Sequence, residues 1–286
     1  MTTPDMGHIT TRFAPSPTGG LHLGHALSAL IGWQLASAAG GRWLVRMEDI
    51  DAGRCKPEHE AGIMADLAWL GLVPGGPVLR QSDRRPAYAK ALDRLRALGV
   101  IYPCHCTRAD LAAAASAPHL PLTGPDGPLY PGTCRLTPVP PQGAAWRLDA
   151  ARAAARAGPL AFEDATLGRV TVDPQLLGDI AVSRRDAGIA YHLAVVVDDA
   201  YQLVTDVVRG QDLRPATHPQ RLLQALLGLP APRYHHHPLI TDPDGKRLAK
   251  RDAGMTIAGL RAQGWSPAQI FSSLENFRLA GQEQKN

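Results

Sequence analysis

Residues 12–25 read RFAPSPTGGLHLGH, and this stretch decides the fold. It begins inside a segment, residues 9–13 (ITTRF), whose composition predicts a short strand, and its prolines and glycines mark a turn-rich loop. Residues 24–38 then predict a helix that is apolar on most sides and therefore buried. Residues 42–48 (RWLVRME) predict the next strand. Strand, glycine-rich loop, helix and strand form a βαβ unit, which indicates a parallel sheet in an α/β fold.

The chain beyond this unit alternates between regular and irregular segments. Residues 116–143 are too rich in proline and glycine to form one regular element, and they look like part of an insertion. The run YHLAVVVDD at 191–199 lacks polar alternation, which predicts a buried strand of the main sheet. Near the C-terminus, Ser266 and Pro267 have the pattern of an N-cap and a first helical residue, so we expect a helix to start there.

The composition indicates an ordinary globular protein. Of its 286 residues, 45% are hydrophobic and 20% are charged, and the net charge of +4 is compatible with an RNA partner without establishing one. There is no apolar run of about 18 residues and no N-terminal secretory pattern, so we expect neither a membrane span nor export. Four cysteines are too few for a disulfide scaffold. We expect a monomer in the reducing cytoplasm.

The HLGH motif at 22–25 is a candidate phosphate-binding motif at the start of the expected helix. A glycine-rich turn at a helix N-terminus offers backbone N–H groups and a favourable dipole to phosphate. Gly24 removes a side chain where a nucleotide would approach closely, and His22 and His25 can donate hydrogen bonds as negative charge develops. A short motif of this kind is weak alone, and two loop histidines without a role are the alternative.

A second motif, GKRLAKRD at 245–252, forms a basic loop after the βαβ elements. Its lysines are suited to stabilising a triphosphate and the leaving pyrophosphate as mobile point charges. A solvated run of charge is the alternative interpretation.

Together, HLGH and RLAKR resemble the paired signatures of class I aminoacyl-tRNA synthetases, and the flanking segments narrow the resemblance. VRMEDID at 45–51 and VVVDDAYQLVTDVVRGQDL at 195–213 are similar to the glutamyl-tRNA synthetase group. The resemblance implies a Rossmann-like catalytic domain, ATP accompanied by Mg²⁺, and Lys250 as the lysine that contacts ATP. The chain departs from the family pattern at Ala249, where Ser is usual, and at Gln211, where Glu is frequent.

Three charged residues suit an amino-acid substrate with two carboxylates and one ammonium. Arg12 and Arg209 offer forked donors to carboxylates, Glu48 can face the ammonium, and each lies at an expected strand end. A structural salt-bridge network is the alternative. The resemblance assigns glutamate binding to Arg12, Phe13, Ala14, Pro15, Ser16, Glu48, Tyr191 and Arg209. It assigns ATP binding to His22, Gly24, His25 and Lys250, with His22, His25 and Lys250 as the catalytic residues.

Three cysteines, Cys104, Cys106 and Cys134, form a candidate zinc site, because clustered thiolates hold this metal. The CxC spacing is tighter than usual, and a fourth ligand must come from elsewhere. The resemblance implies Tyr130, whereas His105 or His119 would be the more ordinary ligand. Three reduced cysteines without a metal are the alternative. We expect one structural Zn²⁺ per chain.

The chain length after the second signature bears on the nucleic-acid partner. Only residues 252–286 follow Arg251, fewer than the about 50 that an independent domain usually needs, so we expect no anticodon-binding domain. With the cysteine insertion, this resembles the truncated paralogues of glutamyl-tRNA synthetase that attach glutamate to queuosine in the anticodon of tRNA(Asp). The alternatives are a truncated enzyme that charges tRNA(Glu), a nucleotidyltransferase that shares only HxGH, and a non-catalytic paralogue that binds RNA or protein.

The expected domains follow from these motifs. Residues 1–100 and 190–240 form the Rossmann-like catalytic domain, and residues 101–189 form the insertion with the zinc site. Residues 241–286 hold the signature loop and a remnant of stem-contacting helices.

Overall fold

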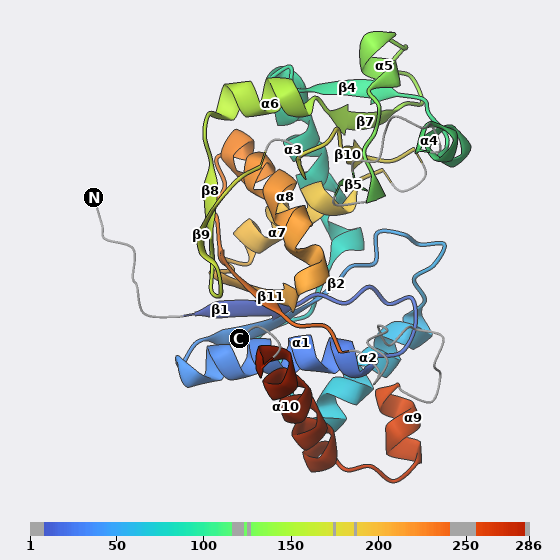
Figure 1. Ribbon diagram of the computed structural model, residues 1–286. Coiled ribbons are helices and arrows are strands. Elements are labelled where there is room, and N and C mark those ends of the chain that lie inside the picture. The colour runs from blue at the N-terminus through green and yellow to red at the C-terminus, as the bar shows by residue number, and fades with distance from the viewer. Residues whose placement is uncertain are drawn as a thin grey trace. The chain divides into compact units, whose positions relative to one another are not determined.

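The computed structural model describes residues 9–115, 123–124, 127–173, 176–185, 188–240 and 256–283. The chain divides into two compact units, each built from segments that are distant in the sequence. Unit 1 comprises Met1–Ser82, Val204–Asp212 and Tyr234–Asn286, and unit 2 comprises Asp83–Leu203 and Leu213–Arg233. Figure 1 labels most of the helices and strands of both units.

Unit 1 is built on a mainly parallel sheet. Its strands lie in the order β3-β2-β1-β11-β12. Strand β1 runs parallel to β2 on one side and to β11 on the other, and β2 runs parallel to β3. The α/β class that the βαβ pattern predicts is therefore confirmed. The bounds are β1 Thr10–Phe13, β2 Arg42–Met47, β3 Leu79–Arg80, β11 Asp206–Gly210 and β12 Arg233–His237.

Helix α1, Leu23–Ala38, connects β1 to β2 and runs along the sheet, as the sequence predicts (Figure 1). Its buried side chains join those of β1, β2 and three further helices in one apolar core. Burial on this scale contributes about 25 cal/mol for each Å² of apolar surface removed from water. The other helices of unit 1 are α2 Pro57–Trp69, α9 Ile257–Ala262 and α10 Pro267–Glu283.

The start of α10 agrees with the expected capping pattern. The Ser266 hydroxyl accepts the backbone N–H of Gln269 at 3.4 Å, and the Ser266 N–H donates to the Gln269 side chain at 2.8 Å. These two bonds satisfy donors at the helix end that have no intrahelical partner.

Unit 2 combines helices with small antiparallel sheets. Strands β10, β7 and β4 form one sheet in that order, β5 pairs with β6, and β8 pairs with β9. The strands are β4 Ile101–Cys104, β5 Thr123–Gly124, β6 Gly127–Pro128, β7 Ala145–Leu148, β8 Ala161–Asp164, β9 Gly168–Thr171 and β10 Ala181–Ser183. The α-helices are α3 Arg85–Ala97, α4 Arg108–Ala115, α5 Thr133–Leu136, α6 Ala150–Ala157, α7 Tyr191–Tyr201 and α8 Arg214–Leu227; short 3₁₀ turns cover Gln81–Arg84 and Gln211–Leu213.

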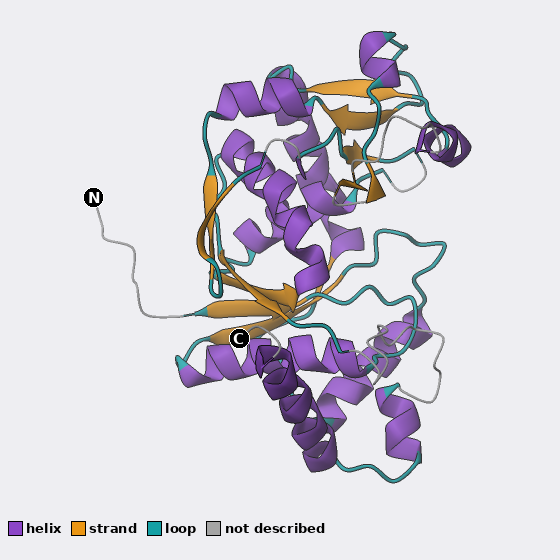
Figure 2. Ribbon diagram, in the orientation of Figure 1, coloured by secondary structure: helices purple, strands orange, loops and turns teal. Residues whose placement is uncertain are grey.

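The expected strand at 191–199 is wrong, because this segment is helix α7 (Figure 2). A helix that is buried on several sides lacks polar alternation just as a buried strand does, so the pattern alone cannot separate them. Two partners on α3 and the turn before it satisfy the buried Asp198 of α7: the Tyr88 hydroxyl donates to its carboxylate at 2.6 Å and Arg84 does so at 3.1 Å. Tertiary context of this kind commonly outweighs the strand preference of a valine run.

The compact units differ in extent from the domains expected from the motifs. Residues Arg85–Ala97 form α3, which packs on α7, α8 and β4 of unit 2. The second signature at 245–252, which includes Ala249 and Lys250, lies outside the described residues, as does His119. Within the described ranges, no helix combines the length and the hydropathy that crossing a bilayer requires.

Candidate active site and metal centre

Three adjacent parallel strands of unit 1 bring charged residues to one edge of the sheet. Arg12 lies in β1, Glu48 directly follows β2, and Arg209 lies one residue before the end of β11. Because β1 pairs in parallel with both β2 and β11, the carboxyl ends of these three strands lie side by side. This edge is where open α/β sheets bind their ligands.

Arg12 is buried, and its guanidinium reaches the neighbouring strand. Its Nη1 donates to the backbone oxygen of Val208 at 3.2 Å, directly beside Arg209 in the chain. The two arginines of the expected amino-acid site are therefore linked through the backbone of β11.

Arg209 is buried and held by two residues of β12 that the sequence motifs did not single out. Its Nε donates to Nε2 of His236 at 3.2 Å, and its guanidinium carbon lies 5.1 Å from the centre of the Tyr234 ring. Accepting this bond requires an unprotonated Nε2 on His236. The local signal was RYHHH at 233–237, an unusual run of histidines in a strand.

Glu48 also has a buried basic neighbour. Its Oε1 lies 3.4 Å from Nη2 of Arg46, a side chain with no exposed surface. The backbone N–H of Glu48 donates to the Pro15 oxygen at 2.9 Å, which ties the end of β2 to the loop after β1. Arg46 falls inside the VRMEDID motif, but its position in a strand gave no sign of its complete burial.

The remaining residues of the expected amino-acid site divide between the two units. In unit 1, Phe13 is buried and stacks on Trp43 with ring centres 6.4 Å apart. Pro15 is buried, Ala14 is half-buried and Ser16 is exposed. Tyr191 belongs to unit 2, where it is the half-buried first residue of α7.

His22 and His25 lie at the start of α1, with His22 as its N-cap. Their rings stack with centres 3.7 Å apart, and the His22 backbone N–H donates to Nδ1 of His25 at 3.4 Å. A Cβ added at Gly24 would meet Cε1 of His22 at 3.1 Å, so glycine here accommodates the imidazole as well as any nucleotide. Two imidazoles beside a helix N-terminus supply both hydrogen-bond donors and a favourable dipole for phosphate.

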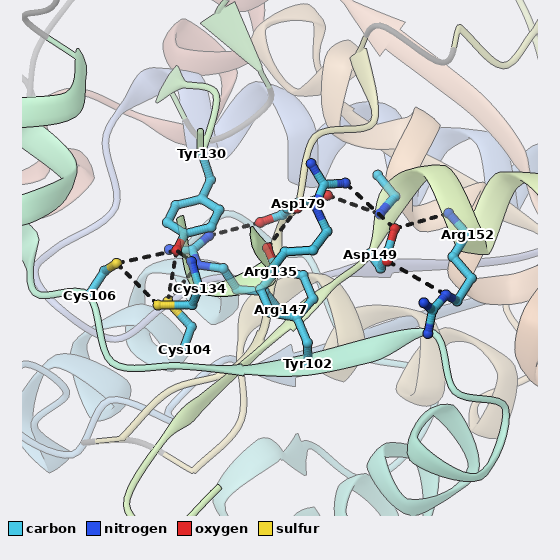
Figure 3. Close-up of polar contacts among 11 residues, drawn as sticks. Tyr102, Cys104, Cys106, Tyr130, Cys134, Arg135, Arg147, Asp149, Arg152 and Asp179 are labelled. Atoms are coloured by element: carbon cyan, nitrogen blue, oxygen red, sulfur yellow. Dashed lines mark hydrogen bonds and ion pairs between the residues drawn. The ribbon is translucent and has the colours of Figure 1, made fainter. Parts of the chain in front are cut away.

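The three expected metal ligands of unit 2 lie together (Figure 3). The sulfur atoms of Cys104, Cys106 and Cys134 all lie within 4.8 Å of one another. The Tyr130 hydroxyl lies 3.5 Å from the sulfur of Cys104 and 3.2 Å from that of Cys106, and it accepts the backbone N–H of Cys134 at 2.9 Å. The cluster thus brings together three thiols and one phenol from a stretch of the chain whose ends, Cys104 and Cys134, are 30 positions apart.

The surroundings of the cluster shift the pKa values of two of its thiols in opposite directions. Burial raises the pKa of Cys106 to about 11. Burial also opposes ionisation of Cys134, but hydrogen bonds from the Tyr130 hydroxyl and from the backbone at His105 outweigh it and lower the pKa of Cys134 to about 7. Burial raises the pKa of Tyr130. The lowered pKa of Cys134 favours its thiolate, the form that binds metal.

The donor set fits a soft divalent metal such as Zn²⁺. Three sulfurs and one oxygen give four donors, the number that structural zinc sites use. His105 is engaged elsewhere, because its Nε2 lies 2.9 Å from the backbone oxygen of Pro140. The Tyr130 hydroxyl lies against the sulfurs of Cys104 and Cys106, which makes it a candidate for the fourth donor.

Comparison with known proteins gives consistent matches along the chain. The family model for the catalytic domain of class I tRNA synthetases (E and Q) matches residues 8–286. The glutamyl-Q tRNA(Asp) synthetase of Rhodobacter capsulatus is 51% identical over 276 residues, which cover 92% of this chain and 98% of that protein. The protein of the same name from Symbiobacterium thermophilum is 47% identical, over 92% of this chain and 84% of its own.

Among solved structures, the glutamate-tRNA synthetase of Elizabethkingia anophelis aligns with a TM-score of 0.71 at 28% sequence identity. The alignment covers 86% of this chain but only 53% of that protein, so this chain spans about half the length of that synthetase.

Proposed function

This chain belongs to the class I tRNA synthetases of the glutamate and glutamine type, and we propose that it activates glutamate with ATP and transfers it to queuosine in tRNA(Asp). Class I synthetases use ATP and Mg²⁺. The observation that carries the proposal is the carboxyl edge of β1, β2 and β11, where two buried arginines and one glutamate lie on adjacent parallel strands. The names of relatives at 51% and 47% identity support the choice of acceptor.

Glutamate recognition follows from charge at this edge. Arg12 and Arg209 bind the two carboxylates and Glu48 binds the ammonium, with Phe13, Ala14, Pro15, Ser16 and Tyr191 completing the site. Both guanidiniums are already fixed by protein acceptors, Arg12 on Val208 and Arg209 on His236. Because these side chains are ordered before the substrate arrives, binding loses less conformational entropy.

Activation is an attack by the glutamate α-carboxylate on the α-phosphate of ATP, which expels pyrophosphate and leaves glutamyl-adenylate. His22, Gly24, His25 and Lys250 bind ATP, and His22, His25 and Lys250 stabilise the charge that grows on the phosphates in the transition state. This is catalysis by positioning and electrostatics, without a covalent protein intermediate. The stacked imidazoles at the start of α1 support the role of the first motif.

Transfer requires a nucleophile on the RNA. In the related synthetases of tRNA charging, a ribose hydroxyl of a vicinal diol attacks the adenylate carbonyl and releases AMP. Queuosine carries a cyclopentene diol of similar shape, so its hydroxyl can attack in the same way. We accordingly propose the anticodon arm of tRNA(Asp) as the macromolecular partner of a monomeric cytoplasmic enzyme.

Cys104, Cys106, Cys134 and Tyr130 hold one Zn²⁺ per chain. Such a metal would supply structural cross-linking, because its four ligands come from β4, the segment after it, the segment before α5 and α5 itself. The cluster of four donor side chains supports this assignment.

Charging of the 3′ end of tRNA(Glu) is the second candidate function. The likeness to a glutamate-tRNA synthetase at 28% identity and a TM-score of 0.71 favours it. The two candidates share the adenylation step and differ in the acceptor.

The deciding experiment incubates the protein with radiolabelled glutamate, ATP and separated tRNA species, followed by nuclease digestion to locate the label. We expect label on the queuosine nucleoside of tRNA(Asp), and none on tRNA(Asp) that carries guanosine at that position. Label on the 3′ adenosine of tRNA(Glu) would establish the second candidate. Absence of glutamate-dependent ATP–pyrophosphate exchange would reject both and leave a non-catalytic paralogue.

A further inference from the structure

We propose that Arg147 is a positioning residue of the metal centre, which holds Cys104 and Tyr130 in place for Zn²⁺ and offsets the negative charge of the thiolates. This inference rests on the zinc site proposed above, and it concerns a side chain outside the four donors. Figure 3 shows the guanidinium of Arg147 beside the cluster.

The strand pairing explains why Arg147 faces the metal ligands. Strand β7 pairs antiparallel with β4, and Arg147 lies directly opposite Tyr102. Opposed residues of an antiparallel pair share a face, and so do residues two positions apart on one strand. Arg147, Tyr102 and Cys104 therefore lie on the same face of the sheet, and Nε of Arg147 donates to the Cys104 sulfur at 3.4 Å.

Arg147 also contacts the fourth donor. Its guanidinium carbon lies 4.0 Å from the centre of the Tyr130 ring. At that distance a guanidinium is attracted to an aromatic face, by about 0.5–2 kcal/mol depending on exposure. The Arg147 side chain thus makes a hydrogen bond to one proposed ligand, Cys104, and a cation–π contact with another, Tyr130.

Groups outside the cluster hold Arg147 in this orientation. Its Nη1 donates to the backbone oxygen of Asp179 at 2.8 Å. The Asp179 carboxylate is itself fixed, because it accepts the Tyr102 hydroxyl at 2.6 Å and the backbone N–H of Ala150 at 3.0 Å. The guanidinium is therefore pre-oriented independently of the ligands that it contacts. A lysine at this position would keep the charge but not the planar fork that makes three contacts at once.

The net charge of the proposed zinc site explains why a positively charged side chain would contact Cys104. Three thiolates carry three negative charges and Zn²⁺ carries two positive ones, so the centre has a net charge of at least minus one in a partly buried position. A guanidinium against one sulfur offsets that charge. Partners of this kind that contact metal ligands typically change metal affinity by about 10–100-fold when they are removed.

The test measures Zn²⁺ binding to the full chain by competition with a chromogenic chelator. We expect Arg147→Gln to weaken zinc affinity at least 10-fold and Arg147→Lys to give a smaller loss. Arg169→Gln is the matched control: Arg169 is exposed on β9 of the same unit, where it pairs with the Glu163 carboxylate at 3.7 Å, and we expect this variant to stay within twofold of wild type.

Cobalt substitution supplies a readout that general destabilisation would not change. In Arg147→Gln, we expect the thiolate-to-cobalt absorption to shift from its wild-type position, whereas Arg169→Gln keeps the wild-type spectrum. Wild-type affinity and spectrum in Arg147→Gln would overturn the proposal. If that variant does not fold by circular dichroism, Arg147→Lys decides, and wild-type affinity there overturns it equally. A wild-type chain that binds no zinc would instead reject the proposed zinc site itself.

Discussion

At the scale of single residues, Arg209 is the residue of the proposed glutamate site whose neighbours are best defined. Its guanidinium is fixed from one side by His236 and Tyr234 of β12. We expect Arg209→Gln to lower kcat/KM for glutamate in ATP–pyrophosphate exchange by about 100-fold, mainly through a higher KM, because a charge-assisted hydrogen bond to a carboxylate contributes about 1.5–3 kcal/mol. Steady-state kinetics with glutamate as the varied substrate measures the effect.

Arg233 provides the matched control for that variant, because it is an exposed arginine at the start of β12. Arg233→Gln should leave the kinetic constants within twofold of wild type. An unchanged KM for glutamate in Arg209→Gln would remove this arginine from the amino-acid site.

Asp66 gives unit 1 a pH-dependent stability. Burial raises the pKa of its carboxyl to about 6, although the charge of Arg261 acts in the opposite direction. The folded state therefore binds a proton that the unfolded state, with a pKa near 3.8, has already lost. Stability falls as the pH rises from about 4 to about 6, by an amount on the order of 2 kcal/mol. Asp66→Asn removes this titration, so its stability should change less across that range.

Urea unfolding followed by tryptophan fluorescence at pH 4.5 and 7.5 compares the two proteins. Glu58→Gln, which changes an exposed carboxylate on the same helix α2, should keep the wild-type difference between the two pH values. The assignment fails if Asp66→Asn shows the same difference as wild type.

At the scale of secondary-structure elements, helix α7 ends in a strained backbone. Leu203 follows its last turn with φ of 56°, a left-handed conformation that glycine adopts freely, and its side chain is 65% exposed. Helix α8 instead has a glycine, Gly228, in this left-handed conformation at its C-cap, with φ of 62°. A non-glycine residue in this region costs about 1 kcal/mol or more. We expect Leu203→Gly to raise the free energy of unfolding by about 1 kcal/mol.

Denaturant unfolding measured by far-UV circular dichroism tests that expectation. Leu203→Ala removes the same exposed side chain but keeps the Cβ, so it should lie within about 0.5 kcal/mol of wild type. Equal stability of the glycine and alanine variants would show that the left-handed backbone at this position stores no measurable strain.

At the scale of the whole molecule, the proposed zinc ligands all belong to one compact unit. Cys104 ends β4 and Cys134 lies in α5, both in unit 2. A metal that binds the folded state stabilises the unit that holds it, and its removal destabilises that unit. We expect a chelator to increase hydrogen exchange in peptides that cover 101–106, 130–136 and 145–148, while peptides that cover 26–38 and 42–47 keep their protection.

Hydrogen exchange with mass spectrometry resolves these peptides in the intact chain. A Cys104→Ser, Cys106→Ser double variant serves as the control, since the chelator should cause no further change in it. Uniform deprotection of both units would mean that the metal stabilises the molecule globally and not through unit 2.

Contiguous sequence was sufficient for the βαβ unit and for the position of HLGH at the start of α1. These two features depend on local properties of the sequence. They are the spacing of apolar residues in a helix, the preference of proline and glycine for turns, and the short connections between successive elements. The CxC motif with a later cysteine also indicated the cluster of three thiols, because chain spacing and residue type limit which side chains can share a metal.

Only the tertiary structure showed that 191–199 is helical and which side chains contact Arg209 and Cys104. Residues 191–199 form a helix whose buried Asp198 is bonded by Tyr88 and Arg84, side chains from another segment. Arg209 meets His236 because β11 and β12 are neighbours in the sheet, and Arg147 meets Cys104 because β7 pairs with β4. Strand order and register set these contacts. They follow from the packing of many distant residues together, which the periodicity of one segment does not encode.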